Sequence, residues 1–205
     1  FTSNVISECF FENLGAGIYV TNIIGVSGTT YVGAIKANLC QFKACTNGVN
    51  LDTRGEYNTF VNCHAVSCTI GYLIKGGNNT FTGGSATNNT NGFSLVAGTN
   101  DAHGVCTGMI INHNTTNIRA VGVANGFLFN GCMVYSGDIN VQTSPNFRFI
   151  GCDISVSYLI TTGSTGIEWI HNKFIITPDL TFFTGTSPIV WNNNFITGMP
   201  VGFPS

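Results

Sequence analysis

The chain has 205 residues with a formal net charge of −2 at pH 7, and 8% of its residues are charged while 43% are hydrophobic. So few charged helix formers argue against long surface helices. The seven basic residues are scattered singly along the chain, so no basic patch is expected that could bind nucleic acid or an anionic membrane. No apolar run reaches the roughly 18 residues of a transmembrane helix, so we expect no membrane insertion.

The chain opens on FTSNVISECF, with neither a Met nor a signal peptide. We therefore expect residues 1–205 to be one domain cut or processed from a longer chain.

A repeated 12-residue unit is the first strong pattern along the chain. ANLCQFKACTNG (37–48) and FVNCHAVSCTIG (60–71) share both cysteines and the closing glycine, and FTGGSATNNTNG (81–92) keeps the frame without cysteines. The two longest spacings between units predict loop insertions near 22–33 and 97–108. Taking the first Cys as the anchor gives nine units, anchored at Cys9, Cys40, Cys63, Gly84, His113, Cys132, Cys152, Lys173 and Asn194.

Each unit has the same order of residue types around its anchor. Asn or Gly precedes seven of the nine anchors, and both residues tolerate the left-handed backbone of a tight bend. An apolar residue stands three positions before every anchor: Ile6, Ala37, Phe60, Phe81, Ile110, Phe129, Phe149, Ile170 and Trp191.

An inward apolar residue, a bend and a small inward residue that recur about every 20 residues describe one coil of a solenoid. Stacked coils pair their backbones about 4.8 Å apart and bury the side-chain columns. We predict an all-β chain, a single-stranded right-handed parallel β-helix of about nine coils. A β-sandwich is the structural alternative, but it does not predict columns in register across nine units.

The coils NTFVNCHAVSCTIGYLI (58–74) and NFRFIGCDISVSYLI (146–160) resemble those of right-handed parallel β-helices, the superfamily of pectate lyases, polygalacturonases, alginate epimerases and bacteriophage tailspikes. The low charge, irregular coils and unpaired cysteines resemble the tailspikes most. That resemblance implies a homotrimer that is assembled in the bacterial cytoplasm and carried on the virion tail. It also implies a partner, a capsular or O-antigen polysaccharide on the bacterial surface.

Two aspartates form the first candidate for catalysis. Asp138 and Asp179 both lie six residues after an anchor, two coils apart. Tyr158, at the equivalent place between them, is a candidate sugar-binding residue. The two aspartates should be roughly 9.6 Å apart, at the upper edge of the separation that inverting glycosidases use for their acid and base. The alternative is that both Asp residues only cap turns, in SGDIN and TPDLT.

A second candidate site combines Asp153 and Glu168 as carboxylates with Arg148, Trp169 and His171 as sugar-binding side chains. Isolated surface charges around one packed Trp are the alternative.

Glu168 also has a structural interpretation. Lys173 breaks the column of small residues in the same coil. The two side chains form a local ion pair, or the phase of this coil is wrong by one residue.

The cysteines and the exposed aromatic residues have structural interpretations. We expect eight free thiols that pack as small hydrophobes, and no metal or other cofactor. Only Asp101, His103 and Cys106 form a group that resembles a metal site, and their spacing fits no known pattern. Phe174 and Phe195 are expected to point outward and pack in a trimer.

The expected function is recognition of a bacterial surface polysaccharide, with hydrolysis favoured over cleavage by a lyase. Two alternatives remain at this stage. The first is a non-catalytic adhesin or structural solenoid, and the second is a secreted polysaccharide lyase or epimerase.

Overall fold

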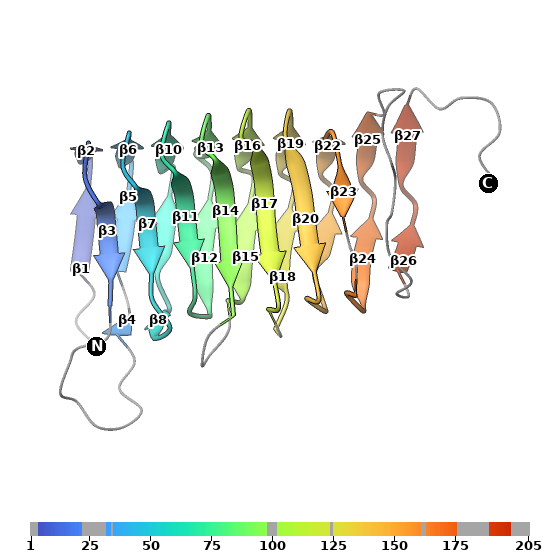
Figure 1. Cartoon of the computed structure of the whole chain (residues 1–205), viewed down its shortest axis with the longest axis horizontal. Coiled ribbons are helices and arrows are strands. Elements are labelled where there is room, and N and C mark those ends of the chain that lie inside the picture. Colours follow the sequence, from blue (N-terminus) through green and yellow to red (C-terminus); the bar gives the residue numbers. More distant parts are fainter. Residues whose placement is uncertain are drawn as a thin grey trace.

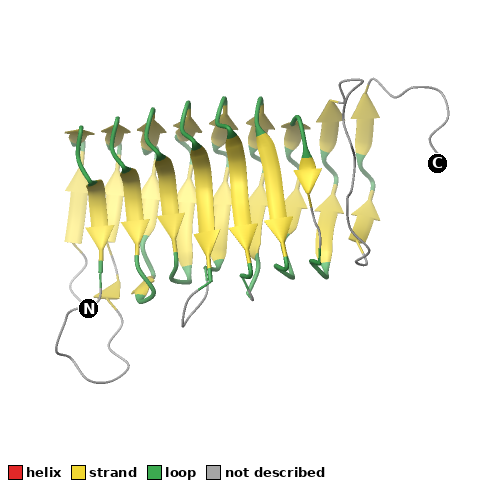
Figure 2. Ribbon diagram, viewed as in Figure 1, coloured by secondary structure: helices red, strands yellow, loops and turns green. Residues whose placement is uncertain are grey.

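Every regular element in the described part of the chain is a β-strand (Figure 2). The computed structural model describes residues 4–21, 32–33, 35–97, 102–123, 125–160, 163–175 and 189–197. Within these residues no helix is long and apolar enough to cross a membrane.

The strands form three long parallel sheets. Sheet A consists of β1 (Asn4–Ser7), β5 (Ile35–Asn38), β9 (Thr59–Val61), β12 (Asn79–Thr82), β15 (Gly104–Thr107), β18 (Phe127–Asn130), β21 (Arg148–Ile150), β24 (Ile167–Ile170) and β26 (Ile189–Asn192). Sheet B consists of β2 (Phe10–Glu12), β6 (Gln41–Lys43), β10 (His64–Val66), β13 (Ser85–Thr87), β16 (Ile110–Asn112), β19 (Met133–Tyr135), β22 (Asp153–Ser155), β25 (Lys173–Ile175) and β27 (Phe195–Thr197). Sheet C consists of β3 (Ala16–Val20), β7 (Asn47–Leu51), β11 (Ile70–Ile74), β14 (Asn91–Val96), β17 (Thr116–Val121), β20 (Asp138–Gln142) and β23 (Leu159–Ile160). A short pair, β4 (Val32–Gly33) and β8 (Gly55–Glu56), lies beside them.

The strands wind as a right-handed parallel β-helix, which confirms the predicted fold. In Figure 1, sheet A runs upward at the back and sheet C downward at the front while the chain advances from left to right. Sheets A and B each contain nine strands, one for each predicted coil, and sheet C contains seven among the described residues. The right-handed winding is the one that parallel connections almost always adopt.

Two coils are shifted in phase from the sequence prediction. Cys106 and Trp169 hold the inward positions expected for Ile110 and Ile170, because they pair in register with Phe129 and Phe149. The first shift arises because Gly104–Thr107, within the segment predicted as an insertion, forms strand β15.

The two shifts also move the buried anchors. Met109 and Asn172 are the buried anchor residues, whereas His113 and Lys173 are exposed. Phe174 was expected to point outward and is instead buried in the core. It pairs with Ile154 on the inward side of sheet B, so it cannot form part of a subunit contact.

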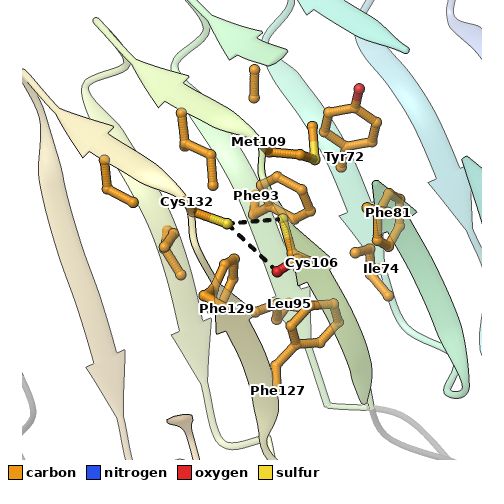
Figure 3. Close-up of a cluster of buried hydrophobic side chains, with 14 of the residues drawn as sticks. Tyr72, Ile74, Phe81, Phe93, Leu95, Cys106, Met109, Phe127, Phe129 and Cys132 are labelled. Atoms are coloured by element: carbon orange, nitrogen blue, oxygen red, sulfur yellow. Dashed lines mark hydrogen bonds between the residues drawn. The ribbon is translucent and has the colours of Figure 1, made fainter. Parts of the chain in front are cut away.

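Aromatic rings stack along the interior from coil to coil. The rings of Phe60 and Phe81 lie 5.1 Å apart, centroid to centroid, and those of Phe129 and Phe149 lie 5.3 Å apart. Figure 3 shows how Phe81, Phe127 and Phe129 fill the space between the sheets together with aliphatic side chains. Burial of one such side chain contributes about 1.5 to 3 kcal/mol before entropy is counted.

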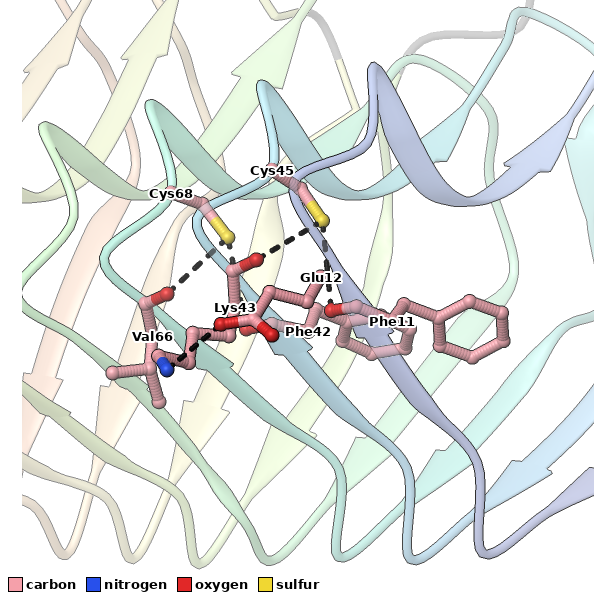
Figure 4. A network of polar contacts seen from close by, with 7 residues as sticks. All are labelled: Phe11, Glu12, Phe42, Lys43, Cys45, Val66 and Cys68. Atoms are coloured by element: carbon pink, nitrogen blue, oxygen red, sulfur yellow. Dashed lines mark hydrogen bonds and ion pairs between the residues drawn. The ribbon is translucent and has the colours of Figure 1, made fainter.

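All eight cysteines are free, as predicted. At the bends each thiol points at backbone carbonyls: Cys68 Sγ lies 3.7 Å from Phe42 O, and Cys45 Sγ lies 3.7 Å from Phe11 O (Figure 4). Cys106 Sγ and Cys132 Sγ lie 3.7 Å apart and share a hydrogen bond, but they form no disulfide (Figure 3). The cysteines of the repeat are therefore packing residues.

Buried asparagines satisfy the backbone at other bends. Asn89 Oδ1 accepts a hydrogen bond from Cys68 N at 2.8 Å, and Asn89 Nδ2 donates to Ala65 O at 3.1 Å and to Asn114 Oδ1 at 3.0 Å. Such internal ladders pair the backbone groups that a bend removes from the sheets.

The closing glycine of the repeat forms a column in sheet C. A Cβ added at Gly48 would lie 2.6 Å from Gly71 O, and one added at Gly71 would lie 2.7 Å from Gly92 O. Glycine recurs at this position because each coil here packs its backbone directly against the next.

Candidate functional site

A groove on the outward face of sheet B is the first candidate for a binding site among the described residues. It has a volume of about 250 Å³ and crosses three neighbouring strands, β19, β22 and β25. We call it the sheet B groove, and its lining residues are Met133, Tyr135, Asp153, Ile154, Ser155 and Ile175.

The groove follows from the alternation of side chains in the strands. Ile154 points inward and is buried, whereas Met133 and Ile175 on either side of it are 45% and 44% exposed. Tyr135 and Ser155 are in register on adjacent strands. The result is an apolar channel that runs along the solenoid and carries hydroxyl groups on one edge.

Asp153 provides the only charge in this lining. Its neighbours in register are Met133 and Lys173, and among the described residues its exposed carboxylate makes no ion pair or side-chain hydrogen bond. An unpaired acceptor beside apolar surface suits a ligand that has hydroxyl donors and an apolar face.

Asp138 begins β20, on the other side of the bend that follows sheet B. The side chain is partly buried, and this desolvation raises the pKa of the Asp138 carboxyl above its ordinary value, although a hydrogen bond with the Tyr158 backbone opposes the shift. Tyr158 lies in the next coil, 51% exposed, just before the Leu159 that pairs with Ile139. Its predicted partner Asp179 lies outside the described residues.

Arg148 and Glu168 form an ion pair on the outward face of sheet A. They are in register on β21 and β24, and Arg148 Nε donates to Glu168 Oε2 at 2.8 Å. The partner of Glu168 is therefore Arg148 and not Lys173. The alternative that the phase of this coil is wrong by one residue is correct.

The second predicted constellation is divided by the fold. Trp169 is fully buried and stacks on Phe149, so its indole cannot contact a sugar at the surface. His171 lies exposed at the bend between sheets A and B, with φ of 53° and a contact of 3.2 Å to Asn193 Nδ2. Asp153 faces outward on sheet B, whereas Glu168 belongs to sheet A.

The sequence did not predict a second, more polar depression at the starts of β15, β18 and β21. It also measures about 250 Å³. The available signal was that Asn125 and Asn146 each stand just before a strand of sheet A. We call it the corner pocket, and its lining residues are His103, Gly104, Asn125, Gly126, Phe127, Leu128, Asn146 and Arg148.

The remaining histidines and cysteines form no further candidate site. His64 Nδ1 lies 3.0 Å from Ser85 Oγ on the open face of sheet B, away from both depressions. Cys106 is in the core, His103 lines the corner pocket, and Asp101 lies outside the described residues. Within the described part of the chain, no group of three or more His, Cys, Asp or Glu side chains is arranged to hold a metal ion.

Comparison with known protein families finds no matching family model, and comparison with curated protein sequences finds no significant match.

Proposed function

We propose that this solenoid binds a bacterial surface polysaccharide along the outward face of sheet B. The observation that supports this most is the sheet B groove, where the unpaired Asp153 carboxylate lies among the apolar side chains of Met133, Ile175 and Tyr135. A sugar ring has an apolar C–H face and a rim of hydroxyl groups. The apolar residues suit the first and the carboxylate accepts hydrogen bonds from the second.

The regular spacing of the strands also favours a polymeric ligand. Equivalent positions repeat along the solenoid axis at the spacing of parallel strands, about 4.8 Å. A chain molecule laid along the axis meets one outward side chain from each coil at this regular spacing, which suits a polymer better than a small metabolite. A bacteriophage tailspike, trimeric in its complete form, is the protein class we propose for such a polysaccharide receptor.

Affinity measurements with a panel of capsular and O-antigen polysaccharides test this proposal. Asp153→Asn and Met133→Ala should weaken binding of a recognised polymer by about tenfold or more, since each removes a contact made in the groove. His64→Ala, in the same outward column but away from the groove, is the matched control and should bind normally. Unchanged affinity in both groove variants would contradict the assignment.

Hydrolysis of the bound polymer is a second candidate function, favoured by Asp138. Burial raises the pKa of the Asp138 carboxyl, which is the direction of shift that a general acid in a glycosidase needs. In this proposal Asp138 donates a proton to the glycosidic oxygen and Asp179 activates water. New reducing ends that disappear in Asp138→Asn and in Asp179→Asn would support it, unsaturated sugars would indicate a lyase, and binding without products would indicate an adhesin.

A further inference from the structure

The corner pocket is separate from the sheet B groove, because it opens where the chain enters sheet A. Its walls come from three successive coils: His103 and Gly104 from the first, Asn125 to Leu128 from the second, and Asn146 and Arg148 from the third. Phe127 is buried and Leu128 is half-buried, so the pocket has apolar side chains between polar ones. Its volume of about 250 Å³ is slightly below the range of sites for drug-sized ligands and suits a single sugar residue.

The charge of this pocket has one sign. Arg148 is its only permanently charged side chain, and no carboxylate is among its lining residues. Glu168, which pairs with Arg148, comes from the next coil and does not line the pocket. Arg148 therefore supplies the cationic donors of this pocket, and its ion-pair partner Glu168 lies on the next coil, outside the lining residues.

Arg148 is held in place for such contacts. Its Nε donates to Glu168 Oε2 at 2.8 Å, and among the described residues its other guanidinium N–H groups have no hydrogen-bond partner. A guanidinium presents its donors as a rigid planar fork that matches the two oxygens of a carboxylate. The ion pair with Glu168 fixes the orientation of that fork before any ligand arrives.

The neighbouring residues supply donors and acceptors for hydroxyl groups. Asn125 and Asn146 are both exposed, and their amides both donate and accept hydrogen bonds. The coils pack closely here: a Cβ at Gly126 would collide with the Asn146 carbonyl, and a Cβ at Gly77 would collide with the His103 ring. These close contacts between neighbouring coils restrict how far the walls can move.

We propose that the corner pocket binds a hexuronate residue, the carboxylate-bearing sugar of an acidic polysaccharide. In this proposal the Arg148 guanidinium donates hydrogen bonds to the sugar carboxylate. Asn125 and Asn146 contact the ring hydroxyls. This inference rests on the proposed polysaccharide-binding function and adds to it the substrate class, because a neutral polymer gives the guanidinium no anionic partner.

The test compares a hexuronate-containing oligosaccharide with the same oligosaccharide after its carboxyl groups have been reduced to alcohols. Titration calorimetry on the folded chain should show binding of the acidic form at least about tenfold tighter than that of the reduced form. Arg148→Ala should remove this preference, and Arg148→Lys should restore only part of it because an ammonium lacks the fork. Arg119→Ala, which removes an exposed Arg on sheet C, should keep the preference.

Two further measurements separate the outcomes. Glu168→Gln should weaken the preference for the acidic form while the protein retains its native circular dichroism spectrum, since Glu168 acts by positioning Arg148. Inorganic phosphate should not displace the acidic oligosaccharide at equimolar concentration, and displacement would overturn the assignment to a carboxylate. Equal affinity for the acidic and reduced forms overturns this inference but leaves the proposed function standing, whereas the proposed function fails if the sheet B groove variants bind polysaccharides normally.

Discussion

The indole of Trp169 lies parallel to the ring of Phe149, with centroids 4.1 Å apart and planes within 5° of each other. The Trp side chain is fully buried, and its Nε1 has no hydrogen-bond partner among the described residues. Its contribution is therefore packing alone, and the polar end of the indole is a cost to the folded state.

Trp169→Ala should lower the free energy of unfolding by about 3 to 5 kcal/mol, because it leaves a large cavity beneath sheets A and B. Trp169→Phe should cost clearly less, since the stack continues and the unpartnered N–H is removed. Urea unfolding curves check both values. Equal losses of unfolding free energy in the two variants would show that the indole N–H has a stabilising partner in the folded chain.

The internal ladder at Asn89 gives a prediction about polarity. Asn89→Ala should destabilise the chain by at least about 2 kcal/mol, because Cys68 N and Ala65 O lose their partner in a buried bend. Asn89→Asp should cost more at neutral pH, since a carboxylate cannot donate to Ala65 O or Asn114 Oδ1, and the extra cost should shrink as acid protonates it.

Asn88→Asp is the matched control for the ladder. Asn88 is exposed and immediately precedes the buried Asn89. Its substitution should change stability by no more than about 0.5 kcal/mol. A loss in this control as large as that in Asn89→Asp would show that charge in this bend, and not the ladder, is responsible.

The coil could be predicted from sequence because its signals are local and repeated. Cysteines, bend-forming Asn or Gly and inward aromatics recur in one order, so a right-handed solenoid with the correct inward column in seven of nine coils follows. The phase failed in two coils that have no cysteine to mark the anchor, although it was correct at Gly84 and Asn194, which also lack one. In the two coils where the phase failed, Met109 fills the buried anchor position with its side chain, and Asn172 fills it with an amide that accepts a hydrogen bond from Cys152 N. Neither residue resembles a cysteine.

The site was harder to predict because it depends on neighbours in other coils. Asp153 was identified from its outward position, but the groove around it also requires Met133 and Ile175 from the coils on either side. Trp169 was placed at the surface because an error of one residue in phase reverses the face of every side chain in a strand. Arg148 was found, but its partner Glu168 emerges only from the register of β21 with β24.

Burial of the Cys63 thiol predicts a loss of stability in base. Desolvation raises the pKa of Cys63 from 9.0 to about 11. Between these values the folded chain holds the proton that the unfolded chain has released, so the stabilisation is complete below pH 9 and falls as pH rises toward 11. At about 1.4 kcal/mol per pKa unit, the loss for this group approaches about 3 kcal/mol.

Urea unfolding between pH 8 and pH 11 measures this effect. Cys63→Ala should lose less stability over this range than the unmodified chain, although it starts from a lower value because a buried side chain has been shortened. Parallel curves for the two proteins would contradict the assignment of the loss to Cys63.

Asp138 should show the opposing demands of stability and function. Burial raises the pKa of this carboxyl, so the unfolded chain releases the proton at a lower pH than the folded chain does. Stability associated with this group is present below the ordinary pKa and is lost as pH rises through the folded pKa. Asp138→Asn removes the ionisation and should therefore make the chain more stable than the wild type at pH 7, with no difference at pH 3.

If Asp138 is also the acid that cleaves the polymer, the same variant gains stability and loses product formation, which is the trade-off expected of a strained catalytic group. Asp153→Asn changes an exposed carboxylate and should leave the pH 7 stability within about 0.5 kcal/mol of the wild type. A destabilised Asp138→Asn at pH 7 would mean that the charged carboxylate is held by partners that favour it, and Asp138 would then be a structural residue of the turn.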